Sequence, residues 1–175
     1  AGIDDGYSSY DMFYRGIITD MNGSGVSDGF LFNASGNLAA MISTIDGREI
    51  SGNNIAGICM EDVMHIVKAI VYKSTINHIG IKGEPVTDDM RELTGENMPD
   101  GMYVTDVLRD STAYKSGIMT GDIITSADAG KVESIRDIQS ALNIVKSDSM
   151  VTIVLKRKIG TGYNEFTIKV PVEAY

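Results

Sequence analysis

The sequence has 175 residues, of which 43% are hydrophobic and 22% are charged, which is ordinary globular composition. This length suits one large domain or two small ones, and no apolar run reaches the roughly 18 residues that a membrane-spanning helix needs. The formal net charge of -9 argues against a nucleic-acid partner, because phosphate binding requires a basic surface.

Cysteine and histidine are scarce in this chain. The single cysteine, Cys59, excludes an internal disulfide, and its apolar surroundings predict a small buried side chain. No set of Cys and His residues has the spacing of metal ligands, and no P-loop or dinucleotide-binding fingerprint is present. The sequence therefore predicts neither a metal site nor a cofactor.

The first third of the chain is expected to be mostly β-structure. Residues 1–10 are polar and predicted to be frayed, whereas residues 13–19 form a predicted strand. A Gly/Ser-rich loop follows at 20–29. The apolar segments 30–32 and 38–42 flank a short polar loop, which is typical of a β-hairpin.

A strand over residues 55–59 is expected to lead directly into a helix over 60–73. Glu61 and Asp62 lie in the first turn of this helix, where acidic side chains suit the helix dipole. One face of the helix carries apolar residues at helical spacing. They are Val63, Ile66, Val67, Ile70 and Val71.

The second half begins after a linker at residues 74–77 and mixes strands with short helices. The predicted strands are 78–82, 102–107, 150–157 and 163–170, and the predicted helices are 86–94 and 134–145. The second of these helices begins with a capping box, in which Ser134 is followed three residues later by Asp137.

The stretch from Ser111 to Ile124, STAYKSGIMTGDII, is the most informative part of the sequence. It predicts a short helix that ends at Gly117 in the left-handed conformation. A turn at Gly121-Asp122 then leads into a buried strand. Glycine is suited to both turns because it has no Cβ.

This order of parts resembles the central signature of a PDZ domain, usually written SPAxxAGLxxGDxI. Thr112 replaces the usual Pro, and Ser116 replaces the usual Ala. Two further anchors lie in the order found in HtrA/Deg-type PDZ domains: the Φ-G-Φ loop at residues 78–81, where Φ is apolar, and the later helix. The resemblance covers residues 77–175.

The resemblance implies a site for the free C-terminus of a peptide. Gly80 lets the backbone turn so that the amides of Ile79, Gly80 and Ile81 can converge on one carboxylate. The peptide then adds as a strand along the edge that begins at Ile81. An apolar pocket would take its last side chain. The expected peptide-binding residues are His78, Ile79, Gly80, Ile81, Ile135, Gln139 and Leu142.

The segment at residues 25–29, GVSDG, matches the pattern G-x-S-x-G. A hairpin follows it, whereas the nucleophile elbow of an α/β-hydrolase needs a helix there. Residues 19–42 instead resemble the serine loop of HtrA-type proteases. On that alignment Ser27 falls on the nucleophile, and Gly25 falls on the oxyanion-hole glycine.

The serine loop departs from the family pattern in ways that oppose catalysis. Asp28 replaces a glycine, and its carboxylate would oppose the negative charge that develops in an oxyanion hole. The family's His and Asp partners belong to a segment upstream of this chain. Neither His65 nor His78 resembles the family's base, and a serine without a base is a poor nucleophile.

The expected fold is therefore mainly β with α. Residues 1–73 would form the C-terminal part of a trypsin-like β-barrel with its connecting helix, incomplete and inactive, and residues 77–175 a PDZ domain. The PDZ domain would be a small β-barrel or sandwich with two helices. The resemblance implies capture of C-termini of unfolded or membrane proteins outside the cytoplasm. Membrane attachment would require a segment not in this chain. Edge strands of the incomplete barrel predict possible homo-oligomers.

Two other interpretations remain open at this point. The chain could be a fragment of an active serine endopeptidase that uses Ser27 with His and Asp from a missing upstream segment. It could also be a scaffold whose peptide groove is occluded. Sequence upstream of residue 1 that contains the His and Asp motifs would favour the first alternative. A failure to bind peptides would favour the second.

Overall fold

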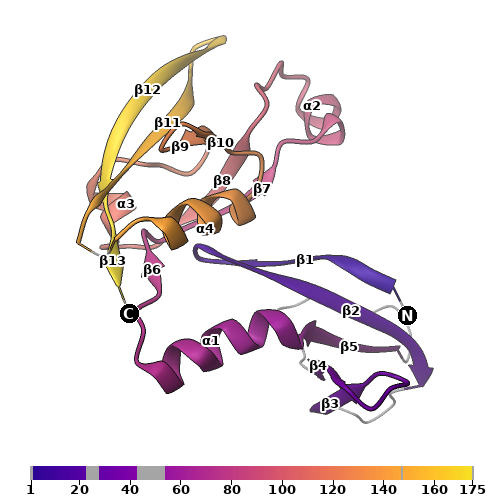
Figure 1. Ribbon diagram of the computed structural model, residues 1–175. Helices are drawn as coiled ribbons and strands as arrows, with labels where there is room; N and C mark the ends of the chain where they lie inside the picture. Colours follow the sequence, from indigo (N-terminus) through magenta and orange to yellow (C-terminus); the bar gives the residue numbers. More distant parts are fainter. Residues whose placement is uncertain (1, 23–27, 43–53, 147, 175) are drawn as a thin grey trace. The chain divides into compact units, whose positions relative to one another are not determined.

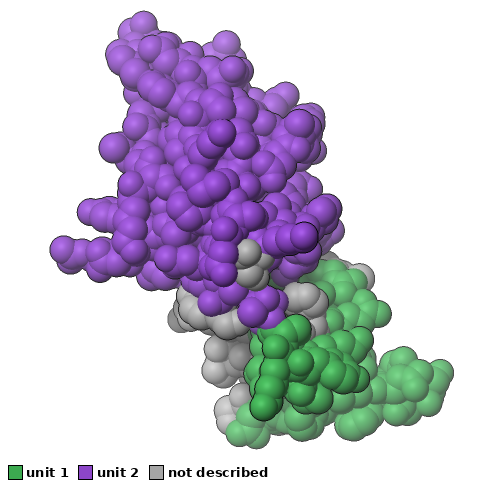
Figure 2. Space-filling model, turned by 60° about the vertical axis from the view of Figure 1, so that its left-hand side comes forward, with its two compact units in different colours: residues 1–7, 13–74 green, residues 8–12, 75–175 purple. Residues whose placement is uncertain are grey.

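The computed structural model describes residues 2–22, 28–42, 54–146 and 148–174. The chain forms two compact units, shown in different colours in Figure 2. Unit 1 comprises Ala1–Tyr7 and Phe13–Ser74, and unit 2 comprises Ser8–Met12 and Thr75–Tyr175. The short segment Ser8–Met12 therefore groups with the C-terminal half of the chain.

Unit 1 is built on a five-stranded sheet with the strand order β1-β2-β5-β4-β3 (Figure 1). Its strands are β1 (Gly2–Ser9), β2 (Met12–Asn22), β3 (Gly29–Phe32), β4 (Leu38–Ile42) and β5 (Asn54–Cys59). The predicted hairpin at 30–42 is confirmed as β3 and β4. The prediction that residues 1–10 are frayed is wrong, because β1 pairs with β2 in this sheet.

Helix α1 (Met60–Tyr72) follows β5 directly, as the sequence predicts, and ends at Lys73 in the left-handed conformation. Its first turn is joined to β2 by Arg15. The Arg15 side chain donates to Asp62 Oδ1 at 2.8 Å and to Glu61 Oε2 at 2.7 Å, and its backbone N–H donates to Asp62 Oδ2 at 2.7 Å. No helix among the described residues is long and apolar enough to cross a membrane.

Unit 2 contains a six-stranded sheet in which β12, β11, β9, β8 and β7 follow one another and β10 pairs with β9. A two-stranded sheet joins β13 to β6. The strands are β6 (Asn77–His78), β7 (Ile81–Pro85), β8 (Met102–Val107), β9 (Ile123–Ala127), β10 (Gly130–Lys131), β11 (Met150–Ile159), β12 (Gly162–Pro171) and β13 (Glu173–Ala174). The helices are α2 (Asp88–Thr94), α3 (Thr112–Lys115) and α4 (Ile135–Ile144).

The two units differ in the size of their buried side chains. The largest fully buried side chains among the described residues all belong to unit 2, with Ile123, Ile153 and Leu155 at its centre. In unit 1 the buried hydrophobic residues are small. They are Ala40, Ala56, Cys59 and Ala69. Unit 2 therefore has a core of its own, which is the main condition for a stably folded domain.

Candidate functional site

The candidate site centres on the loop between β6 and β7, where Gly80 has a φ of +87°. A Cβ at this position would lie 2.4 Å from Ser111 Cβ and 2.7 Å from Ser111 Oγ. Both the backbone conformation and the space therefore require glycine. Ser111 begins α3, where its side chain accepts a hydrogen bond from Tyr114 N at 3.2 Å.

The segment around α3 fixes the direction of the loop. Leu108 N donates to Gly80 O at 2.8 Å, and Ala113 N donates to Ile79 O at 3.0 Å. Because these carbonyls are bonded to the segment 108–113, the amides of the loop are available to a different acceptor. The predicted short helix is α3, and the predicted turns at Gly117 and Gly121 follow it with φ values of +88° and +92°.

The acceptor that meets these amides is the carboxylate of Asp11. Its Oδ2 accepts from Ile79 N at 2.9 Å and from Gly80 N at 2.5 Å, and its Oδ1 accepts from Ile81 N at 3.3 Å. The Asp11 backbone N–H donates to Ile81 O at 2.8 Å. The residue is only 3% exposed. The amides at 79–81 therefore converge on one carboxylate, which belongs to a residue of the same chain.

Burial raises the pKa of the Asp11 carboxyl above its ordinary value. The hydrogen bonds from the three loop amides, and the charge of the nearby His78, act in the opposite direction. Next to Asp11, the Tyr10 hydroxyl donates to Asp106 Oδ2 on β8 at 2.5 Å. This hydrogen bond is the main reason that the pKa of Tyr10 is raised.

Strand β7 lies at the end of the larger sheet in the described part of the chain, with β8 on its inner side. Its outer edge begins at Ile81, whose carbonyl accepts from Asp11. A terminal strand beside a carboxylate-binding loop is the arrangement that allows a peptide to add as a further strand.

Helix α4 carries the other predicted groove residues. Ile135, Gln139 and Leu142 lie at i, i+4 and i+7 and share one face of the helix. Ile135 and Leu142 are buried, and Gln139 is half-buried. The helix packs against β6, β7, β9 and β10. The backbone of α4 thus forms one side of the candidate groove, next to β7.

Asn77 connects the end of α4 to the loop, a role that the sequence does not reveal. Its Nδ2 donates to Leu142 O at 2.9 Å and to Val145 O at 2.6 Å. These carbonyls would otherwise lack partners at the end of the helix. His78 follows Asn77 on β6, with its Nε2 3.8 Å from Glu173 Oε2 on β13.

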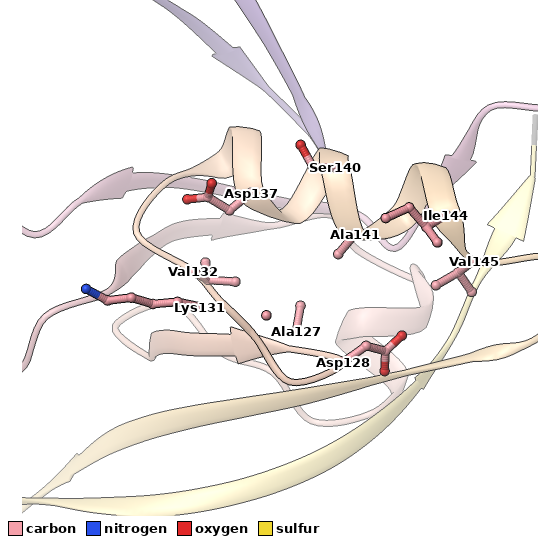
Figure 3. A pocket seen from close by; sticks show the side chains of 10 residues that line it. Ala127, Asp128, Lys131, Val132, Asp137, Ser140, Ala141, Ile144 and Val145 are labelled. Carbon is pink, nitrogen blue, oxygen red and sulfur yellow. The ribbon is translucent and has the colours of Figure 1, made fainter.

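A separate pocket of about 350 Å³ lies on another side of α4 (Figure 3). Its lining residues are Asp137, Ser140, Ala141 and Ile144 of the helix, Val145 after it, and Ala127, Asp128, Gly130, Lys131 and Val132. None of its described lining residues belongs to the 79–81 loop. The pocket is therefore distinct from the candidate peptide groove.

The predicted protease residues cannot be placed. Ser27 and Gly25 lie outside the described residues, while Asp28 is exposed and directly precedes β3. Among the described residues, no group of three or more His, Cys, Asp and Glu side chains is arranged to hold a metal ion.

The loop, the terminal strand and the adjacent helix together define a PDZ fold. The family model of the PDZ domain matches residues 77–171, and the chain belongs to this family. Its curated homologues are HtrA/DegP-type serine proteases. One is a serine protease Do-like HtrA of Lactobacillus helveticus, 28% identical over 144 residues, covering 76% of this chain and 35% of the relative.

A second relative, a probable periplasmic serine endoprotease DegP-like of Rhizobium meliloti, is 26% identical over 138 residues. That match covers 76% of this chain and 27% of the relative. The chain thus spans about a third, or less, of the length of these two relatives.

Among solved structures, the HtrA-type protease AlgW with a decapeptide matches with a TM-score of 0.57 and 18% identity. The match covers 94% of this chain and 56% of that chain. The fold is thus mainly β with a few helices, of the type found in HtrA-type proteases and their PDZ domains.

Proposed function

We propose that unit 2 binds the free C-termini of proteins at the 79–81 loop. One observation carries the proposal: three backbone amides converge on a single carboxylate beside a terminal strand. Several N–H groups aimed at one point form an anion site, and the adjacent strand edge offers main-chain hydrogen bonds to an extended peptide. The ligand class that combines a carboxylate with an extended backbone is a peptide C-terminus.

In this proposal the peptide carboxylate binds the amides of Ile79, Gly80 and Ile81, and its backbone pairs along β7. The last side chain of the peptide enters an apolar site between β7 and α4. Ile79, Ile81, Ile135, Gln139 and Leu142 are the proposed residues of that site. His78, beside the loop, is the proposed neighbour of the incoming chain.

We further propose that residues 1–73 are the C-terminal part of a trypsin-like barrel that joins the PDZ domain at residues 77–175. The exposed apolar side chains of unit 1 support this, since Phe32 is 65% exposed and Ile70 is 71% exposed. A partial barrel lacks the strands that would cover its apolar side chains. We therefore expect its sheet to have no large buried side chain, as is the case among the described residues of unit 1. Such edges could also pair with a second copy of the chain.

The proposed ligands are the C-termini of unfolded or membrane proteins outside the cytoplasm. The names of relatives support the location, because two of them are called periplasmic serine proteases. AlgW, which has the same fold, has a decapeptide in its structure.

The test is a titration with a labelled library of hexapeptides that end in Ala, Val, Leu, Ile or Phe. The free-acid library is compared with its C-terminally amidated twin by fluorescence anisotropy. The chain and the variant Asp11→Ala, whose loop amides lose their internal acceptor, are both measured. We expect the free acids to bind at least about tenfold tighter, because an amide cannot accept as a charged group does.

A pair of glycine variants locates the binding. Gly80 and Gly117 have φ values of +87° and +88°, but only a Cβ at Gly80 meets other atoms within 4 Å. Gly80→Ala should abolish the preference for free acids, while Gly117→Ala carries the same backbone strain and should retain it. Circular dichroism checks that both variants fold. No free-acid preference in either the chain or Asp11→Ala would contradict the proposal.

A further inference from the structure

We infer that the turn at Tyr10 and Asp11 is an internal ligand of the 79–81 loop and competes with peptide C-termini for it. The inference rests on the proposed function of this loop and adds its regulation. The turn joins β1 to β2 and lies almost 70 residues before the loop in sequence, so the contact is a tertiary one. The chain would thus carry its own occupant for the peptide site.

The contacts of Asp11 reproduce those that a bound C-terminal residue would make. Such a residue offers a carboxylate to the amides of the loop and a backbone N–H to the first carbonyl of the edge strand. Asp11 offers both groups: its side chain meets the three amides at 2.5–3.3 Å, and its N–H donates to Ile81 O at 2.8 Å. A peptide carboxylate and the Asp11 carboxylate therefore cannot be bound at the same time.

The site around Asp11 is buried on all the sides that the described residues form. Asp11 is 3% exposed, and Ile79 and Ile81 on either side of Gly80 are fully buried. Ile135 and Leu142 on the proposed groove face of α4 are buried as well. A peptide that places its last side chain between β7 and α4 must open this packing, so the described conformation is closed to ligand.

The interactions that hold the Tyr10-Asp11 turn against the loop are weak enough for the turn to leave it. Asp11 has a φ of +57°, a left-handed conformation that costs a non-glycine residue some strain. The neighbouring anchor, the hydrogen bond from Tyr10 to Asp106, is exposed to solvent, where such bonds contribute little. If the open form is a minor population, the apparent dissociation constant of a peptide equals its intrinsic value divided by that population.

Two readouts test the inference on the full chain. The first is hydrogen exchange of the Ile79, Gly80 and Ile81 amides without peptide, which should be at least about tenfold faster in Asp11→Ala. The second is the affinity for the free-acid library, which should be at least about tenfold higher in Asp11→Ala if the open form is below roughly a tenth of the population.

Matched variants separate competition from changes in charge or stability. Asp89→Ala removes the same charge from an exposed site on α2 and should leave both readouts unchanged. Tyr10→Phe removes only the anchor to Asp106, without touching the loop. It should raise peptide affinity by about threefold, in line with the loss of one exposed hydrogen bond.

Each outcome bears on the inference. Equal peptide affinity in the chain and in Asp11→Ala overturns the competition while leaving the proposed function intact, provided that free acids still bind better than amides. Unchanged exchange of the three amides overturns the docking of Asp11 itself. If neither protein prefers free acids, the proposed function fails and the competition fails with it.

Discussion

Asp122 shows how one buried carboxylate can hold the scaffold behind the binding loop. It is 1% exposed and accepts from Arg157 Nε at 2.6 Å and from Arg157 Nη2 at 2.7 Å. The same guanidinium donates to Gly117 O at 2.7 Å and lies 5.6 Å from the ring centre of Phe166. Through Arg157, the aspartate of the Gly121-Asp122 turn therefore ties both glycine turns to β11.

Removing the cation of this pair should be costly. Arg157→Met would leave the Asp122 carboxylate buried, with the hydrogen bond from Met119 N at 2.9 Å but without a cation beside it. Breaking a buried pair in this way is expected to lower the free energy of unfolding by about 3 kcal/mol. Urea denaturation followed by circular dichroism measures the loss.

Lys131→Met is the matched control for this variant. Lys131 pairs with Glu133, and their side chains are 70% and 62% exposed, so the loss of this pair should lower stability far less than the loss of the buried one. Similar losses in Arg157→Met and Lys131→Met would show that the buried pair does not hold the two turns.

At the scale of elements, local patterns in the sequence predict much of the fold. Strand β8 has the predicted bounds, and the capping box at Ser134 begins α4, where Asp137 Oδ2 accepts from Ser134 N at 2.9 Å. These signals are local, since they depend on alternation, helical spacing and capping within a few residues. The Φ-G-Φ loop is also local, because Gly80 itself marks it.

The parts of the fold and site that the sequence did not predict depend on contacts between residues far apart in the chain. The polar sequence of residues 1–10 has no alternating pattern, and β1 exists because it pairs with β2. Asp11 meets the loop across almost 70 residues, and Asn77 meets α4 across 65 to 68. A single Asp or Asn has no sequence signature for a partner so far away, so these parts of the site could not be predicted.

The end of α4 offers a prediction at this scale. Val145 follows the helix with extended backbone and provides no glycine cap, so Asn77 supplies the donors that the last carbonyls need. Asn77→Ala should lower the free energy of unfolding by about 1–2 kcal/mol, because two carbonyls lose their donor. It should also weaken peptide binding, since α4 forms one side of the proposed groove.

Asn143→Ala provides the control, because Asn143 is exposed in the same turn of α4. Stability is measured by urea denaturation and peptide affinity by anisotropy. If the two variants lose the same stability and affinity, the hydrogen bonds from Asn77 do not position the helix.

For the molecule as a whole, the two units bear unequal parts of the proposed activity. Unit 2 has the large buried side chains and the candidate site, whereas unit 1 exposes large apolar side chains along β3 and α1. The chain contains two histidines, His65 in α1 and His78 on β6. His78 lies beside Glu173 within unit 2, among the groups proposed for peptide binding.

The serine loop can be tested directly. A fluorophosphonate probe labels serines that are activated by a base, and the chain is expected to give no more labelling than its Ser27→Ala variant. Trypsin in the same reaction serves as the positive control. Labelling that disappears in Ser27→Ala would contradict the expectation from the sequence that the protease portion is inactive, and would favour the endopeptidase fragment.

The competition that we infer would also make Asp11 limit how fast the proposed peptide site fills. A ligand that must wait for an occupied loop to empty binds no faster than the occupant leaves, however concentrated the ligand becomes. At high peptide concentration the observed association rate would then level off at the rate at which the Asp11 turn leaves the loop. The residence time of Asp11 on the amides of 79–81 would set the fastest rate at which a peptide can bind.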